Sequence, residues 1–197
     1  NTEYSIYLDD QSTYTNEAAE SANAVTNVSL IDAEGKTVAE AEGNKVVLDV
    51  KDVHLWDGLK DPYLYTLKAE LIVNGKVVDE ISCNCGVRYF EFRPEDGFHL
   101  NGRHYPLHGI SRHQDFKGIG NAITKAHHDQ DMELILEVGA NTVRLAHYQH
   151  DQYFYDLCDK NGLIVWAEIP YISEHLANGN ENTISQMKEL IVQNYNH

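Results

Sequence analysis

The residues best suited to chemistry stand together in the second half of the chain. Arg144, His147 and Tyr148 lie within or just after residues 142–146, an apolar run whose pattern predicts a short buried strand. Amphipathic helices are expected on both sides of it, which is typical of a βα repeat with parallel strands. The three polar side chains would therefore lie at the carboxyl end of a parallel strand, where β/α barrels carry their chemistry.

Two more parallel strands and three helices are expected around that strand. The strands are predicted at residues 105–110 and 163–169, and the helices begin at Thr124, near Asp151 and near Thr183. Because three strands cannot close a barrel of eight, we expect the chain to be cut from a longer protein and to hold only the first βα units of a (β/α)8 TIM barrel. An open three-stranded sheet is the alternative, but it would leave edges and faces uncovered.

The first half of the chain predicts antiparallel strands joined by tight turns. Residues 63–73 alternate apolar and polar side chains, Asn74–Gly75 favours a type I′ turn, and residues 76–83 return as the partner strand. Further strands are predicted at residues 24–31, 37–39, 45–50 and 87–92. Several short strands in about 90 residues suggest a β-sandwich of immunoglobulin-like type.

A turn-rich link at residues 93–97 separates the two halves, and we place the domain boundary there. The immunoglobulin-like sandwich is assigned to residues 1–96 and the partial barrel to residues 97–197. Residues 10–23 are polar, so we expect them to be disordered or poorly packed and the first sheet to be incomplete.

Composition excludes several classes of partner and site. The 197 residues carry 15 Lys and Arg against 31 Asp and Glu, and the formal net charge of -16 argues against nucleic acid or an anionic membrane. No window approaches the roughly 18 apolar residues of a membrane-spanning helix. Cys83 and Cys85 lie two apart on a predicted strand, too far for easy bridging, and all three cysteines are expected to be reduced or inert. No Cys or His spacing suggests structural zinc.

The other prominent aromatic and imidazole side chains are assigned structural places. His127 and His128 fall on the polar side of a predicted helix and are expected to be solvated. Trp56 is expected in the core of the sandwich, and Trp166 in a buried strand.

Several separate motifs, in order along the chain, resemble glycoside hydrolase family 2. The run Asn141-Thr-Val-Arg144-Leu-Ala-His147-Tyr148, continuing through Phe154-Tyr155, Asp159 and Gly162-Leu-Ile-Val-Trp166, is similar to the first signature of that family. The family usually has a small residue where Leu145 stands and proline where Gln149 stands. The resemblance also covers Leu55-Trp56, Asp61-Pro62-Tyr63-Leu64-Tyr65, Gly86-Val87-Arg88, Asp96 to Gly102 and Gly109 to Asp115.

The resemblance implies a retaining exo-β-glycosidase with a sugar-binding jelly roll, an immunoglobulin-like domain and a catalytic barrel. Retaining hydrolysis uses two carboxyl groups about 5–5.5 Å apart. In the family the acid/base is the Glu of an Asn-Glu pair after the fourth barrel strand, which would lie beyond His197, and the nucleophile lies farther still. We therefore expect neither catalytic carboxylate in this chain, and no glycosidase activity from the chain alone.

The resemblance also implies roles for four residues of the chain. His113 and His147 would donate hydrogen bonds to sugar hydroxyls, Arg144 would hold the nucleophile ionised and oriented, and Glu168 would be a polar residue beside the substrate. The fixed fork and permanent charge of a guanidinium suit the role given to Arg144. The alternative is that the histidines are loop or core residues and that Arg144 pairs with a structural carboxylate.

Neither a metal nor a cofactor is predicted. Glu168 matches an acidic position that binds magnesium in some bacterial β-galactosidases, but Ile172 and Glu174 stand near where its acidic and histidine partners would be. A single carboxylate does not make a magnesium site.

Among the activities of the family, we favour β-galactosidase, because Arg112-His113-Gln114-Asp115 is more similar to that branch than to β-glucuronidases, which more often carry lysine before the histidine. β-Glucuronidase or β-mannosidase is the alternative, and a non-catalytic structural or subunit-contact module is a second class. The expected partners are a terminal β-linked sugar and the rest of the parent enzyme. Homo-oligomerisation, the linkage cleaved and the cellular compartment are left open.

Overall fold

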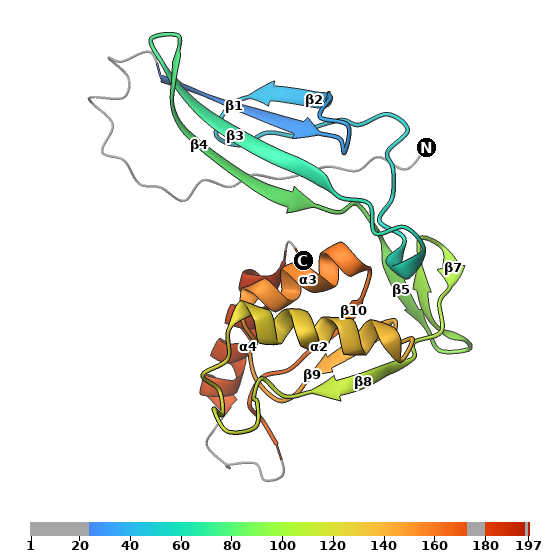
Figure 1. Ribbon diagram of the computed structural model, residues 1–197. Helices are drawn as coiled ribbons and strands as arrows, with labels where there is room; N and C mark the ends of the chain where they lie inside the picture. The colour runs from blue at the N-terminus through green and yellow to red at the C-terminus, as the bar shows by residue number, and fades with distance from the viewer. Residues whose placement is uncertain (1–23, 173–179, 196) are drawn as a thin grey trace. The chain divides into compact units, whose positions relative to one another are not determined.

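The computed structural model describes residues 24–172, 180–195 and 197, which divide into two compact units (Figure 1). Unit 1 contains residues 24–55 and 63–87, and unit 2 contains residues 56–62 and the described residues from 88 onwards. The units divide between Val87 and Arg88, and the domain boundary at residues 96 and 97 stays a prediction. The polar residues 10–23 lie outside the described residues.

The described residues of unit 1 include an antiparallel sheet with the strand order β2-β1-β3-β4. Its strands are β1 (Ala24–Ile31), β2 (Thr37–Glu42), β3 (Tyr65–Val73) and β4 (Lys76–Cys85). Asn74 and Gly75 both have positive φ angles, 51° and 75°, as the predicted type I′ turn between β3 and β4 requires. The hairpin predicted from its turn residues is therefore confirmed.

The core of unit 1 forms where alternate side chains of the sheet meet the segment that follows β2. Val28 and Leu30 of β1 and Leu67 of β3 are buried together with Val46 and Leu48. The predicted strand at residues 45–50 is wrong, because this segment has no ladder partner among the described residues, and its side chains pack into the core.

Unit 2 begins with a small antiparallel sheet of β5 (Phe90–Arg93), β6 (Gly97–Leu100) and β7 (Arg103–His104). The strand predicted at residues 87–92 starts later, because β5 takes its register from β6 through the pair Phe90↔Leu100. It therefore belongs to unit 2 and not to the sandwich-like unit.

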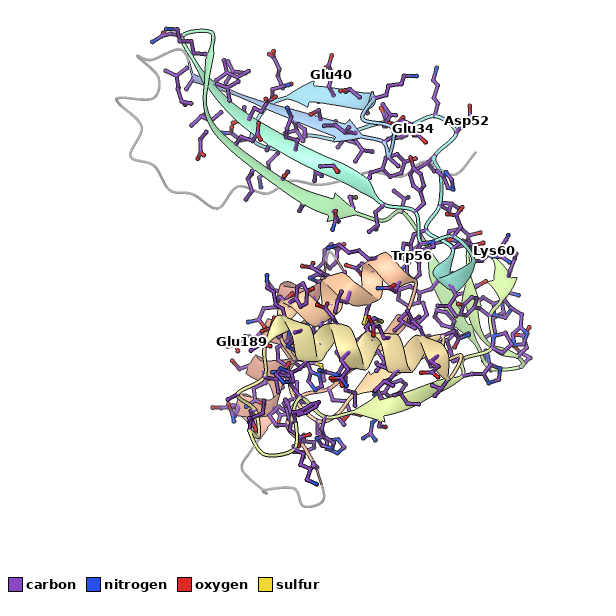
Figure 2. All side chains as sticks on the ribbon, viewed as in Figure 1. Glu34, Glu40, Asp52, Trp56, Lys60 and Glu189 are labelled. Carbon is purple, nitrogen blue, oxygen red and sulfur yellow. The ribbon has the colours of Figure 1, made fainter. Side chains whose placement is uncertain are left out.

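Trp56 is buried as predicted, but it lies in unit 2 and not in the sandwich core. It stands just before the short 3-10 helix η1 (Gly58–Lys60), and both Trp56 and Lys60 are labelled in Figure 2. Its indole Nε1–H donates to the carbonyl oxygen of Asp159 at 2.7 Å, and the guanidinium of Arg88 lies 5.1 Å from its ring centre.

The second sheet of unit 2 is parallel, with the order β10-β9-β8. Its strands are β8 (Gly109–Arg112), β9 (Thr142–Leu145) and β10 (Ile164–Ala167), and the helices are α2 (Lys125–Glu137), α3 (Gln152–Asn161) and α4 (Asn180–Asn194). Gly109, Thr142 and Ile164 are in register at one end of the sheet. A methyl group on Gly109 would clash with the carbonyl oxygen of Thr142, so this close pairing requires glycine. The β/α fold class is confirmed, although β8 starts later than predicted.

Local signals set the helix boundaries. Thr124 is the N-cap of α2, and its backbone N–H donates to Nδ1 of His127 at 3.0 Å. The Asp151 carboxylate accepts the N–H of Tyr153 at 2.8 Å at the start of α3, and Gly162 ends α3 with a φ of 78°. No helix among the described residues is long and apolar enough to cross a membrane.

The parallel sheet has two unlike faces. Helices α2 and α3 lie on the same face (Figure 1), where Val143 and Leu145 of β9 pack against Phe154 of α3. Arg144 and Trp166 alternate with these positions and point to the opposite face. The burial predicted for Trp166 is wrong, since it is 61% exposed on the face that the helices do not cover.

Candidate active site at the carboxyl edge of the parallel sheet

The candidate site is built from residues at or just after the carboxyl ends of three neighbouring parallel strands. His113 follows β8, Arg144 and His147 lie in and after β9, and Glu168 follows β10. Because the strands run in the same direction and are in register, these positions come to one edge of the sheet. The structure therefore brings all four predicted site residues to the same region.

Arg144 and Glu168 form a bidentate ion pair across β9 and β10. Arg144 Nε lies 2.5 Å from Oε1 of Glu168, and Nη2 lies 3.2 Å from Oε2. Trp166 is directly opposite Arg144 in the ladder, so Glu168, two residues later, points to the same face as Arg144. The hydrogen bond from Arg144, followed by one from His147, lowers the pKa of Glu168, so this carboxylate is ionised at neutral pH.

His147 joins this pair through its Nδ1 atom, which lies 2.7 Å from Oε2 of Glu168 and 3.1 Å from Nη2 of Arg144. An arginine nitrogen only donates and a carboxylate only accepts, so a single Nδ1 cannot bond to both at once. The shorter contact to an ionised carboxylate favours Nδ1–H donating to Glu168. In that tautomer, the Nε2 atom of neutral His147 is an acceptor.

His113 and Tyr148 complete the rim of the site. The rings of His113 and His147 are 5.2 Å apart at 75°, and the His113 ring lies 6.2 Å from that of Tyr148. The Tyr148 hydroxyl accepts the backbone N–H of Gln114 at 3.1 Å. His113 is exposed, and the side chains of Arg144, His147 and Glu168 retain part of their accessible surface. A ligand can therefore reach polar atoms of all four residues.

The partner of Arg144 in the structure is Glu168, a carboxylate of the next strand. Such pairing is what the alternative interpretation expected of Arg144. The pairing with Glu168 does not use all the N–H donors of the Arg144 guanidinium, which has five. The orienting role predicted for Arg144 and the sugar-binding roles predicted for His113, His147 and Glu168 stay predictions.

One group with metal-ligand spacing occurs among the described residues, and it is separate from this site. Asp156, Asp159 and His197 can each offer a ligand atom, with all three atoms within 4.8 Å of one another. His197 Nδ1 is already 2.7 Å from Asp159 Oδ2, and its Nε2 is 2.8 Å from Oε1 of Gln152. Ordinary hydrogen bonding explains this group without an ion.

The sequence reasoning missed a buried polar cluster on the opposite face of the same sheet. Arg112 of β8, 5% exposed, contacts His128 of α2 and His150, which precedes α3. The expectation that His128 is solvated is wrong, because this side chain is 2% exposed. The helical spacing of His128 with the buried Met132 and Ile135 was the available signal, since positions four and seven residues apart share a face.

Comparison with known proteins agrees with this fold. Residues 93–196 match the family profile described as the TIM barrel domain of glycosyl hydrolases family 2, and residues 5–88 match the profile described as glycosyl hydrolases family 2. The chain belongs to glycosyl hydrolase family 2. The predicted family is therefore confirmed, and with it the assignment of unit 2 to a partial β/α barrel.

Individual relatives of this family 2 chain carry two different activities in their names. It is 39% identical over 181 residues to a β-glucuronidase of Bacteroides fragilis, covering 85% of the chain and 26% of the relative. It is 33% identical over 192 residues to a β-galactosidase of Thermoanaerobacterium thermosulfurigenes, covering 90% of the chain and 26% of the relative. The chain thus spans about a quarter of the length of these curated relatives.

A solved structure of a named β-glucuronidase is also similar to this chain. The structure of a β-glucuronidase from Ruminococcus gnavus in complex with D-glucuronic acid matches with a TM-score of 0.79 at 28% identity, over 88% of the family 2 chain and 30% of that protein. The curated relatives at 39 to 40% identity are named as β-glucuronidases, and the curated β-galactosidases are more distant. A solved structure named as a putative β-galactosidase of Bacteroides fragilis is 40% identical, with a TM-score of 0.83 over 89% of this chain and 28% of that protein.

The names of the curated relatives with the highest identity weigh against our preference for β-galactosidase. That preference rested on arginine before His113. The Arg112 side chain points to the helix-covered face, where it contacts His128 and His150 and not the face that carries Arg144 and Glu168. Arg112 therefore does not line the candidate site itself.

Proposed function

We propose that this chain is the sandwich-like domain and the first part of the catalytic barrel of a retaining β-glucuronidase. The observation that carries the proposal is the convergence of Arg144, His147 and ionised Glu168 at the carboxyl edge of a parallel sheet. That edge is where barrel enzymes bind their substrates. Among the curated relatives, the higher identity to a named β-glucuronidase than to a named β-galactosidase supports the choice of sugar, although a solved structure named as a putative β-galactosidase is 40% identical.

The residues of this chain would bind and orient the sugar, not break its glycosidic bond. His113 and His147 offer imidazole nitrogens to sugar hydroxyls, and Glu168 offers carboxylate lone pairs. Bidentate contact with Arg144 keeps Glu168 ionised, so it accepts hydrogen bonds and does not donate a proton. The donors of Arg144 that do not face Glu168 suit a second carboxylate, which we propose is the nucleophile supplied by the rest of the enzyme. The two carboxyl groups that carry retaining hydrolysis would then lie outside this chain.

β-Galactosidase is the second candidate, favoured by the 33% identity to the enzyme of T. thermosulfurigenes over 90% of the chain. The sheet-edge cluster would suit both sugars if it binds the hydroxyl groups at C2 and C3, whose configuration the two have in common. A glucuronide and a galactoside differ in the configuration of the C4 hydroxyl and in the group at C6. We assign the recognition of these two positions to residues outside this chain.

The test is hydrolysis of chromogenic β-glucuronide, β-galactoside and β-mannoside by this chain and by a protein extended through the rest of its reading frame. We expect only the extended protein to act and the glucuronide to be preferred. Preference for the galactoside would move the assignment to the second candidate. Turnover by the 197-residue chain alone would contradict the placement of the catalytic carboxylates, and silence of both proteins would favour a non-catalytic module.

A further inference from the structure

The buried polar cluster around Arg112 lies on the helix-covered face and has no role in the proposed chemistry. Four side chains form it, and we call it the Arg112 cluster: Arg112, His128, Asp131 and His150. Arg112 Nε and Nη2 both lie 2.8 Å from Oδ2 of Asp131, while Nη1 and Nη2 lie 3.0 Å from Nδ1 of His150 and of His128. The guanidinium also lies 3.9 Å from the ring centre of Phe154. Every nitrogen of this buried cation is thus in contact with an acceptor.

The contacts of Arg112 fix the protonation of both histidines. Guanidinium nitrogens only donate, so Nδ1 of His128 and Nδ1 of His150 must be unprotonated acceptors. Each neutral ring then carries its proton on Nε2. Burial, with the neighbouring Arg112 charge acting in the same direction, lowers the pKa of His150 to about 4 and also lowers that of His128. Both rings are therefore neutral at neutral pH, as their geometry requires.

The proton on Nε2 gives His150 a second contact. Nε2 lies 3.2 Å from the carbonyl oxygen of Ala146, so His150 accepts from Arg112 with one nitrogen and donates to Ala146 with the other. The backbone N–H of Ala146 donates to the carbonyl oxygen of Arg112 at 3.0 Å. Both polar groups of Ala146 are thus held, one by the backbone of Arg112 and one through His150. The next residue along the chain is His147.

We propose that His150 is a positioning residue that holds His147 against Glu168 through the backbone of Ala146, and that Arg112 fixes the tautomer in which His150 donates to Ala146. The distance from Nδ1 of His147 to Oε2 of Glu168 is 2.7 Å, and a shift of the Ala146 carbonyl would move the His147 backbone directly. Neither Arg112 nor His150 contacts the sugar in this scheme. Only the effect on turnover rests on the proposed function, since the backbone contacts exist without a substrate.

The first test is histidine side-chain NMR on the 197-residue chain labelled with 15N at both ring nitrogens. We expect His150 as the neutral Nε2–H tautomer at pH 7, with Nδ1 unprotonated. A protonated Nδ1 on His150 would overturn the proposal, because that nitrogen could not then accept from Arg112. This measurement needs neither a variant nor activity, so it decides even if every variant fails to fold.

The second test uses two variants that separate the contacts of His150. In His150→Asn, the side-chain oxygen can replace Nδ1 as acceptor for Arg112, but the donor to Ala146 is lost. In His150→Gln, the amide N–H can replace Nε2–H as donor to Ala146, but the acceptor for Arg112 is lost. We expect the ring signals of His147 to change in His150→Asn and to stay unchanged in His150→Gln.

The same pair is then compared in the extended protein. We expect kcat/KM to fall about tenfold in His150→Asn, as for other small displacements of binding groups, and to change less than about threefold in His150→Gln. A purely structural role would lower stability in both variants without a change in the His147 signals, and that result would overturn the proposal. If the wild-type extended protein hydrolyses none of the glycosides, the proposed function fails, while the NMR comparison still decides the positioning role.

Discussion

The two faces of the parallel sheet in unit 2 each pair an arginine with a carboxylate, but in opposite surroundings. Arg144 is 45% exposed and reaches Glu168 on the face that the helices leave open. Arg112 is 5% exposed and reaches Asp131 on the face covered by α2 and α3. An exposed pair contributes little to stability and remains open to a ligand, whereas a buried charge must keep all its partners. We therefore propose that the same pair of groups serves ligand binding on one face and stability on the other.

The two arginines also differ in the contacts that their guanidinium groups make in addition to the carboxylate. Arg112 has Asp131, two histidine nitrogens and the Phe154 ring around its guanidinium. Arg144 has Glu168 and a contact to His147, and part of its surface faces solvent. Removing Arg112 leaves buried polar atoms without partners, while removing Arg144 leaves atoms that water can reach.

The largest expected effect on stability is therefore that of Arg112→Met. It should lower the free energy of unfolding by about 3–5 kcal/mol, because Asp131, His128 and His150 would lose their cationic partner in a buried site. Arg144→Met is the matched control and should cost less than about 1 kcal/mol. Urea unfolding of the 197-residue chain and both variants measures the difference. Equal losses in the two variants would show that the faces do not differ as we infer.

The same comparison can be sharpened with pH. The pKa of buried His150 is lowered from its ordinary value of 6.5 to about 4, so between these values the unfolded chain binds a proton that the folded chain does not. Stability should fall as pH decreases through this window, by up to about 3 kcal/mol at 1.4 kcal/mol per pKa unit. The lowered pKa of His128 acts in the same direction.

His150→Gln is the control for this pH effect, because glutamine does not titrate. The difference in unfolding free energy between wild type and His150→Gln should shrink as the pH falls from 7 to 4.5. Subtracting the unfolding free energies of the two proteins also removes the effect of His197, which has the opposite sign. The hydrogen bond to Asp159 raises the pKa of His197, so the contribution of His197 to the free energy of unfolding is lost as pH rises. A difference that stays constant with pH would mean that His150 is not held neutral in the folded chain.

The features that could be predicted from the sequence are those set by local chemistry. The turn at Asn74–Gly75, the cap at Thr124 and the end of α3 at Gly162 follow from backbone preferences of single residues. The meeting of Arg144, His147 and Glu168 was predictable in outline, because carboxyl ends of neighbouring parallel strands share one edge. Their pairing was not, since it depends on the register that puts Trp166 opposite Arg144.

The features that could not be predicted depend on contacts between distant segments. Val46 and Leu48 have the pattern of a strand, yet tertiary packing buries them with no ladder partner in the part of the chain that the structure describes. Arg112 and His128 are residue types usually found in solvent, and their burial becomes tolerable only because β8, α2 and the segment before α3 bring complementary atoms together. Trp166 lies in a strand whose sheet is covered by helices on one face only. The periodicity of the sequence does not show that Trp166 points to the uncovered face.

The smallest expected effect on stability, with a large effect on function, is that of Glu168→Gln on the open face. The amide keeps the shape of the side chain but loses the charge that Arg144 and His147 contact, so His147 loses its ionised acceptor. We expect an unfolding free energy within about 1 kcal/mol of wild type, since the pair is partly exposed. In the extended protein we expect kcat/KM for the preferred glycoside to fall about a hundredfold, the scale seen when one charge-assisted contact is removed from an active site.

Glu40→Gln, on β2 of unit 1 and labelled in Figure 2, is the matched control for that substitution, because it removes an exposed carboxylate remote in sequence from the site residues. It should change neither stability nor kcat/KM. A Glu168→Gln protein that unfolds easily but retains full activity when folded would assign Glu168 to the scaffold, as Asp131 is on the other face. Loss of activity with stability retained would instead show that the two arginine–carboxylate pairs have different roles. Only the solvated pair can exchange its partners for a sugar without unfolding the sheet that carries it.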